Sequence, residues 1–253
     1  MANARFRPDC VNHGMDTLSI RWSAKYGHFL RAEANVNALS YPMPPRTAIL
    51  GMLAAILGLE KDQLSVELAD VRVAVSGKVP TRFWHRVKLR KDPPAALPWE
   101  IKRTQRGAES PAPEKAMLLN QEWLLNPDFM VHVAWPEQPA RFDELVARIH
   151  DRRWHFTPCM GLSELLCDIA YVDVQTATPL PFGRHLVQGV CPADQVRLLT
   201  AERLGVHMLR LPYSVSVDRV FRHVPYCLEH RGEQFPVETP SAWQTSTWTG
   251  LFL

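Results

Sequence analysis

The sequence has few cysteines, and none of them forms a paired motif. Its five cysteines are scattered and include no Cys-x-x-Cys pair, so we expect reduced thiols and no structural zinc. The spacing Cys10-x-x-His13 could supply two metal ligands, but no second pair lies near it in the sequence. We therefore expect neither a metal site nor a disulfide framework.

A long hydrophobic run is also missing. The longest apolar stretch, residues 48–59, is too short to cross a bilayer, and residues 1–9 lack the apolar core of a signal peptide. We expect a cytoplasmic protein with no membrane contact. The chain has 253 residues, 46% of them hydrophobic, and can bury a substantial core.

Several catalytic motifs are absent as well. The sequence contains no GxxxxGK[ST], GxGxxG or GxSxG, so nucleotide hydrolysis, dinucleotide binding and α/β-hydrolase chemistry have no support. A metal-dependent nuclease needs clustered carboxylates, whereas Asp168 and Asp173 flank a predicted strand at a spacing that places them on opposite faces. Metal-free RNA cleavage needs only a general base, a general acid and a cation. Five side chains could in principle supply these groups: Lys25, His28, Tyr41, His85 and Lys88.

Positive charge is concentrated in one segment, residues 78–106. Nine basic residues there face two acidic ones, so the segment carries about seven positive charges of a chain whose net charge is +3. Aromatic side chains are interleaved with the basic ones, which suits single-stranded nucleic acid because bases stack on rings and phosphates pair with cations. The alternative is a solvated loop whose charges serve solubility.

Residues 41–58 predict one short, buried helix with a sharp start. The prolines at 44 and 45 suit a first helical turn, and Gly58 stands where a C′ glycine would end the helix. Apolar residues recur at helical spacing at Ile49, Leu53, Ile56 and Leu57. The other face consists of the small residues Gly51, Ala55 and Gly58. This face would let a strand or another backbone approach closely.

The predicted elements follow βαββαβ order. Strands are predicted at residues 17–29, 71–79, 129–135 and 169–178, and helices at residues 45–57 and 142–150. This order is that of the ferredoxin-like fold, an α+β class that includes the RNA-recognition domains, with both helices on one face of an antiparallel sheet. We expect it to occupy residues 1–185, followed by a small β-rich region over residues 186–253.

The interruption between the second and third strands, at about residues 80–128, is too long for a hairpin turn. Residues 82–90 alternate basic and apolar or aromatic side chains, and residues 117–125 could pair back against them. Residues 91–114, which contain prolines and few apolar residues, would form the tip. We therefore predict a protruding thumb.

Two stretches carry a resemblance to a known family: Tyr26-Gly27-His28-Phe29, and residues 40–53 with the sequence SYPMPPRTAILGML. Together they resemble the N-terminal signature of the CRISPR-associated Cas-five family, whose members are subunits of type I RNA-guided Cascade complexes. A weaker similarity is GLSELL at residues 161–166, where many members carry an arginine-rich Gly-x-x-Glu-Phe/Tyr-Leu stretch. In this chain Ser163 stands in that stretch without a neighbouring arginine.

The resemblance implies a noncatalytic subunit that caps the 5′ handle of the CRISPR RNA (crRNA) and joins a Cas-seven type backbone subunit to a Cas-eight type large subunit. Target DNA would be met through the assembled complex, and no cofactor is implied. In the family the thumb holds the first nucleotides of the guide RNA. The residues expected to contact RNA are Lys25, His28, Arg31, Tyr41, Arg46, Arg82, Trp84, His85, Arg86, Lys88, Arg90, Lys102, Arg103 and Arg106.

Alternatives remain open at this point. One branch of the family cuts precursor crRNA with a tyrosine, lysine and histidine set, but this chain lacks that branch's adjacent lysine and histidine. A stand-alone RNA-binding module is a third possibility. Tyr41 could stack on a base or could be a core ring. Arg46 could hold a phosphate at the positive end of the helix, or it could be a solvated cap residue.

Overall fold

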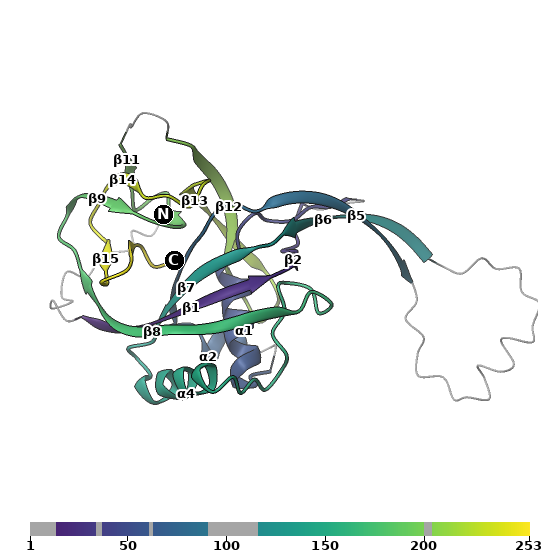
Figure 1. Ribbon diagram of the computed structural model, residues 1–253, viewed down its shortest axis with the longest axis horizontal. Helices are drawn as coiled ribbons and strands as arrows, with labels where there is room; N and C mark the ends of the chain where they lie inside the picture. Colours follow the sequence, from purple (N-terminus) through teal and green to yellow (C-terminus); the bar gives the residue numbers. More distant parts are fainter. Residues whose placement is uncertain (1–13, 34–36, 61–62, 91–115, 200–203) are drawn as a thin grey trace, which may run out of the picture.

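A six-stranded sheet forms the centre of this mixed α+β fold (Figure 1). The computed structural model describes residues 14–33, 37–60, 63–90, 116–199 and 204–253. The strand order is β16-β15-β8-β1-β7-β4, and the pairs among β8, β1, β7 and β4 are antiparallel. The strands are β1 (Met15–Ala24), β4 (Arg72–Ser76), β7 (Asp128–Ala134), β8 (Cys167–Pro179), β15 (Trp243–Gln244) and β16 (Thr249–Gly250).

Helices α1 (Arg46–Leu57) and α4 (Pro139–His150) lie on one side of this sheet, with the short α2 (Leu64–Glu67) beside α1 (Figure 1). The apolar residues of α1 pack into the same buried core as alternate residues of β1. Burial of this apolar surface is the main force that holds the helices on the sheet. Among the described residues, no helix is long and apolar enough to span a membrane.

Both ends of α1 follow the sequence prediction. Pro45 is the extended residue just before the helix, and Gly58 ends it in the left-handed region with φ 80°. The N–H of Gly58 donates to the Ala54 carbonyl at 2.8 Å. The small face also meets another backbone, because the Phe156 N–H donates to the Ala55 carbonyl at 2.9 Å.

The predicted first strand, residues 17–29, is divided into two. β1 ends at Ala24, and β2 (Tyr26–Gly27) leaves the central sheet to pair with Leu124 and Leu125. Sequence alternation alone does not reveal this division, because both pieces keep the period of two. The other predicted strands and helices of the βαββαβ order are present, with ends that differ by a few residues.

A long β-hairpin projects from the body of the molecule (Figure 1). Its arms are β5 (Thr81–Arg90) and β6 (Ala116–Leu125), which confirms the two predicted thumb arms. At its base, β6 also pairs with β2 and with β3 (Asn37–Ala38). The predicted tip, residues 91–114, lies outside the described residues.

The C-terminal part is rich in strands, as predicted. Two small sheets have the orders β10-β13-β12 and β11-β14-β9. Their strands are β9 (Gly183–Val187), β10 (Cys191–Pro192), β11 (Arg197–Leu198), β12 (Val206–Val215), β13 (Phe221–Glu229) and β14 (Phe235–Thr239). Leu211, Tyr226 and Leu228 join the main core, so this region packs closely on the central sheet. A domain boundary at residue 185 stays a prediction.

A buried polar pair lies on the sheet face opposite the helices. His132 on β7 is 2% exposed, its Nδ1 lies 3.1 Å from the Ser19 Oγ, and its ring stacks on Trp248 at 4.4 Å. Burial lowers the pKa of His132 to about 4. The folded protein therefore holds this imidazole neutral at physiological pH.

His132 makes the stability depend on pH. The unfolded chain binds a proton at this residue near pH 6.5, whereas the folded chain binds it near pH 4, so stability decreases as the pH falls through this window. We expect this residue alone to lower the free energy of unfolding by about 2 kcal/mol between pH 7 and pH 5. Urea titrations at several pH values measure it. His132→Gln should flatten the slope, whereas His150→Gln, at an exposed position, should not; an unchanged slope in His132→Gln contradicts the prediction.

Candidate nucleic-acid interface

The projecting hairpin separates its side chains onto two faces. β5 and β6 pair antiparallel, with Trp84 opposite Glu122 and Arg86 opposite Asn120. Because side chains alternate along a strand, one face carries a basic and aromatic set and the other a compact aromatic set. The basic face holds Arg82, Trp84, Arg86 and Lys88, all of them exposed.

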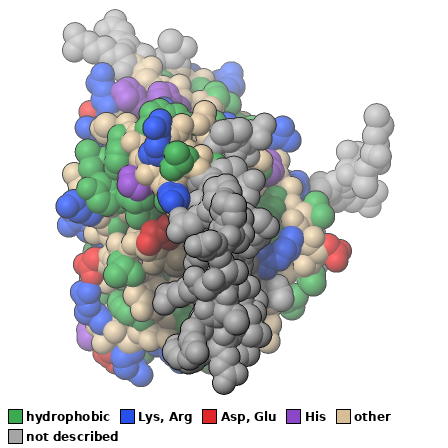
Figure 2. Space-filling view, turned by 90° about the vertical axis from the view of Figure 1, so that its right-hand side faces the viewer, with side chains coloured by type: hydrophobic (Ala, Val, Ile, Leu, Met, Phe, Trp, Pro, Cys, Tyr) green, Lys and Arg blue, Asp and Glu red, His purple; other side chains and the backbone are tan. Residues whose placement is uncertain are grey.

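Trp84 is the exposed ring on the basic face. Its side chain is 55% exposed and is flanked on the strand by Arg82 and Arg86. The Arg86 Nε donates to the Asn120 Oδ1 at 3.3 Å, which holds the guanidinium against the hairpin. An exposed indole between cations can stack on a base while the cations meet phosphates. Seen from the side on which the hairpin projects, basic side chains are scattered with hydrophobic side chains between them (Figure 2).

The opposite face stiffens the base of the hairpin with four rings. Trp123 lies at its centre, 5.4 Å from Tyr26, 6.1 Å from Phe83 and 4.1 Å from His85 between ring centroids. Such ring contacts contribute beyond their buried area. Lys25 lies beside this cluster, with its Nζ 5.5 Å from the centre of the Tyr26 ring. His85 thus packs within the hairpin, on the face opposite Trp84.

Glu122 ties the hairpin to the segment that precedes α1. Its side chain is 11% exposed; Oε1 lies 3.2 Å from Arg82, and Oε2 accepts the Ser40 N–H at 3.0 Å. Its backbone carbonyl lies 2.8 Å from the His28 Nδ1. Sequence reasoning did not single out Glu122, although it is the only charged residue of β6.

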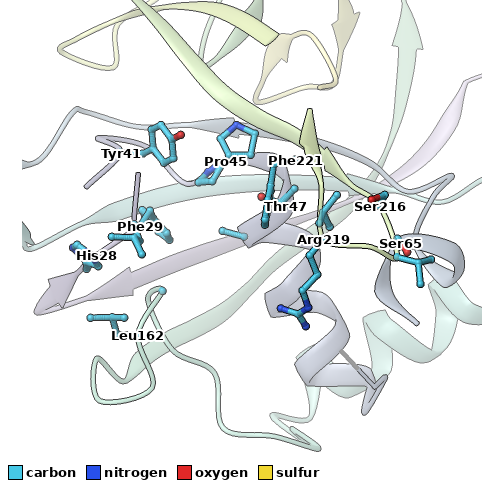
Figure 3. A pocket seen from close by; sticks show the side chains of 16 residues that line it. His28, Phe29, Tyr41, Pro45, Thr47, Ser65, Leu162, Ser216, Arg219 and Phe221 are labelled. Carbon is cyan, nitrogen blue, oxygen red and sulfur yellow. The ribbon is translucent and has the colours of Figure 1, made fainter. Parts of the chain in front are cut away.

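A largely apolar groove of about 450 Å³ opens beside the base of the hairpin. Three segments that are far apart in the sequence line it, namely residues 28–30, 41–48 and 161–162, together with the turn between β12 and β13. Both stretches that the sequence singled out as motifs therefore meet here. Figure 3 shows His28, Phe29 and Leu162 toward one end of the groove, Ser65 and Ser216 toward the other, and Thr47, Phe221 and Arg219 between them.

Gly161 makes the close contact between the loop at residues 161–166 and the first motif, residues 26–29, possible. Its φ is 95°, and a Cβ at this position would lie only 1.8 Å from the His28 carbonyl oxygen. Only glycine combines this backbone conformation with so close an approach. The adjacent Met160 carbonyl accepts the His28 N–H at 3.0 Å. The loop is thus held against the first motif through backbone atoms.

His28 and Tyr41 lie in the wall of the groove and are largely buried, at 1% and 3% exposed. Burial lowers the pKa of His28 and raises the pKa of Tyr41. The Tyr41 hydroxyl lies 3.2 Å from the His223 Nε2. The Arg31 guanidinium lies 5.7 Å from the centre of the Tyr41 ring and 3.5 Å from the Glu33 carboxylate.

Arg46 lies in the interior, not on the surface where a phosphate would meet it. It is 7% exposed, and its terminal nitrogens donate to three backbone carbonyls. These acceptors are Ala69 at 3.2 Å, Val71 at 2.8 Å and Tyr213 at 3.4 Å. Burial lowers its pKa. Arg46 joins the start of α1 to β12, because tertiary packing brings these carbonyls to the guanidinium.

Four of the predicted RNA-contacting residues lie partly or wholly outside the described part of the chain. Arg90 ends β5 and its backbone pairs with Ala116, but its side chain lies outside the description. Lys102, Arg103 and Arg106 fall in the stretch 91–115, which lies outside the described residues. Within the described ranges, no group of three His, Cys, Asp or Glu side chains gathers to hold a metal ion.

The turn between β12 and β13 is a part of the site that sequence reasoning missed. Val217, 64% exposed, and Phe221, 49% exposed, line the groove with Arg219. The turn joins two strands of the region that the sequence predicted to be β-rich. Nothing in the local pattern indicated that this turn would lie over the motif segments, because that contact depends on the packing of the two regions.

An exposed basic and aromatic hairpin beside an apolar groove, on a mixed α+β fold, combines the features that suit single-stranded nucleic acid. The family model Cas_Cas5d, described as CRISPR-associated protein (Cas_Cas5), matches residues 17–211. The chain therefore belongs to the CRISPR-associated Cas5 family. A comparison of the sequence with curated proteins found no match.

Several solved structures match this chain, and two of them cover most of it with a TM-score of 0.50. A chain of a CRISPR RNA-guided surveillance complex matches with 16% identity and a TM-score of 0.50, covering 88% of this chain and 91% of that one. A CRISPR protein from Archaeoglobus fulgidus matches with 18% identity and a TM-score of 0.50, covering 93% of this chain and 98% of that one. This chain therefore shares its fold with these CRISPR proteins.

Proposed function

We propose that this protein is a noncatalytic, RNA-binding subunit of a type I Cascade complex that caps the 5′ handle of the crRNA. The observation that carries the proposal is the joining of the basic hairpin to the groove through Glu122, which contacts Arg82, Ser40 and His28. A single strand could follow the exposed cations with its phosphates and turn its bases toward the apolar groove.

The proposed fold agrees with this role. The order β1, α1, β4, β7, α4, β8 is βαββαβ, and we assign these elements to a ferredoxin-like domain, the plan of many RNA-recognition modules. The hairpin is then the thumb inserted between its second and third strands. We further propose a Cas-seven type backbone subunit and a Cas-eight type large subunit as partners, and target DNA as the ligand of the assembled complex. Such a complex would work in the cytoplasm.

A second candidate function is metal-independent cleavage of precursor crRNA. One observation favours it: the Tyr41 hydroxyl lies 3.2 Å from the His223 Nε2 beside the groove, with the Arg31 guanidinium close to the Tyr41 ring. These groups are an acid, a base and a cation. However, Tyr41 is 3% exposed and its pKa is raised by burial, so its hydroxyl is poorly placed to give up a proton.

One preparation tests the proposed function. The chain purified with its operon partners should carry RNAs that share one 5′ sequence, and the chain alone, with or without Mg²⁺, should leave repeat RNA uncut. Bound RNA of random sequence contradicts the proposal. A single defined cut that disappears in Tyr41→Phe, His223→Ala or His85→Ala assigns the second function instead.

A further inference from the structure

Among the residues that the structure describes, the outer edge of β8 is open along most of its length. Residues Cys167 to Ala177 pair with β1 on one side. On the other side, β15 pairs with β8 only at Thr178 and Pro179. Within the described ranges, no strand pairs with the outer side of residues 167–177. The described strands therefore leave a row of backbone N–H and C=O groups on this side of β8 without a strand partner. Figure 1 shows the course of β8 along the sheet.

The opposite edge of the same sheet is covered. Beyond β4, the Val190 N–H donates to the Val75 carbonyl at 2.9 Å, and the Leu253 N–H donates to the Val73 carbonyl at 2.7 Å. Two backbone segments thus use the groups that β4 would otherwise present. The described part of the chain covers the β4 edge of the sheet and leaves the β8 edge without such cover.

β8 has few of the features that keep an edge strand from pairing with another chain, such as lysine, proline or a bulge. It contains no lysine or arginine, and its only proline, Pro179, is its last residue. Three apolar side chains are exposed along it: Tyr171 at 36%, Val172 at 46% and Val174 at 38%. One irregularity is present, because the register with β1 shifts at Val172. Residues 173–177 form a regular stretch beyond it.

We propose that this edge, chiefly residues 173–177, binds an extended segment of another protein subunit, which adds to the sheet as a further strand. Backbone hydrogen bonds would supply affinity, and side chains over Val174 would supply selectivity. β8 carries no basic residue, and its charges are Asp168, which is ion-paired with Arg152, and Asp173 within the stretch 173–177. A segment that combines apolar residues with lysine or arginine therefore fits, whereas a second copy of β8 would bring acidic edges together.

Residue-resolved hydrogen exchange in the free chain and in the assembled complex tests the proposal. The amides of residues 173–177 that β1 does not engage should exchange quickly in the free chain and at least about tenfold more slowly in the complex. Equal rates in the two states overturn the proposal. Slow exchange already present in the free chain overturns it too, because the edge would then be occupied by the chain itself.

A double variant, Val174→Lys with Thr176→Lys, tests the same edge independently. Both positions are exposed, so the free energy of unfolding should change little. A smaller amount of one partner protein subunit should co-purify with the variant, whereas its affinity for RNA should equal that of the parent chain. This difference separates the inference from the proposed function. Val66→Lys, at a 68% exposed position on α2, should assemble normally. Normal assembly of the double variant, or a dimer of the free chain that the two lysines abolish, overturns the proposal.

Discussion

Replacing Arg82, Arg86 and Lys88 together by glutamine is expected to weaken crRNA binding about 50-fold at 0.15 M salt. The three cations lie on the exposed face of β5. Each phosphate contact on a single strand contributes about 0.7 to the slope of log affinity against log salt, so the slope should become shallower by about two units. Fluorescence anisotropy with labelled repeat RNA at four or more salt concentrations measures both quantities.

The matched control removes three arginines at other places on the surface, of which Arg153 and Arg184 are exposed and Arg141 is partly exposed. Arg141, Arg153 and Arg184 lie on α4, just beyond it and on β9, so their replacement by glutamine should leave the slope nearly unchanged. The control variant should unfold within about 1 kcal/mol of the parent, since exposed ion pairs contribute little to stability. The hairpin variant should lose more stability, because Arg82→Gln removes the partner of the Glu122 carboxylate, whose side chain is only 11% exposed. An unchanged slope in the hairpin variant would mean that these cations are solvated and do not contact RNA.

Gly161→Ala is expected to lower the free energy of unfolding by about 3 to 5 kcal/mol. The methyl group would lie 1.8 Å from the His28 carbonyl oxygen, and the φ of 95° strains any residue with a Cβ. Backbone strain and overpacking each cost roughly 1 to 3 kcal/mol. Urea titration followed by circular dichroism measures the loss, and the variant should also lose crRNA affinity because this loop forms a wall of the groove.

Gly183→Ala is the matched control for Gly161→Ala. A Cβ at Gly183 would meet its nearest atom, the His185 Nε2, at 3.7 Å, an ordinary contact. Its free energy of unfolding should therefore change by less than about 1 kcal/mol. If Gly161→Ala were as stable as the control, the loop would have room to move away from His28, and the close approach of the two motifs would not be needed for folding.

The sequence predicted well those elements whose structure depends on the residues next to them in the chain, such as helix ends and the alternation along a strand. The Pro44-Pro45 start and Gly58 end of α1 depend on backbone preferences that neighbours hardly change. The alternation in residues 82–90 likewise predicted β5 and the face on which its cations lie, because side-chain direction in a strand depends only on position. The resemblance in residues 26–53 indicated the family that the family model then showed.

The predictions for single site residues had a different outcome. Arg46 stood at a helix start, where a phosphate is favoured, yet carbonyls from residues 69, 71 and 213 surround it. His28 and Tyr41 are likewise buried in the groove wall. Contacts between residues more than 20 positions apart determine these environments, and no local pattern encodes them. Glu122 was missed for the same reason.

The sequence by itself indicated the family, through the resemblance in residues 26–53. It also indicated the main strands and helices, the hairpin arms and the basic character of β5, because these depend on local composition and on short periodic patterns. Only the tertiary structure decided which motif residues are buried, that Gly161 and the β12–β13 turn line a groove on the first motif, and that β8 has an open edge among the described strands. Burial and convergence arise when distant segments pack together, and the free energy of that packing is shared among residues that no window of sequence contains.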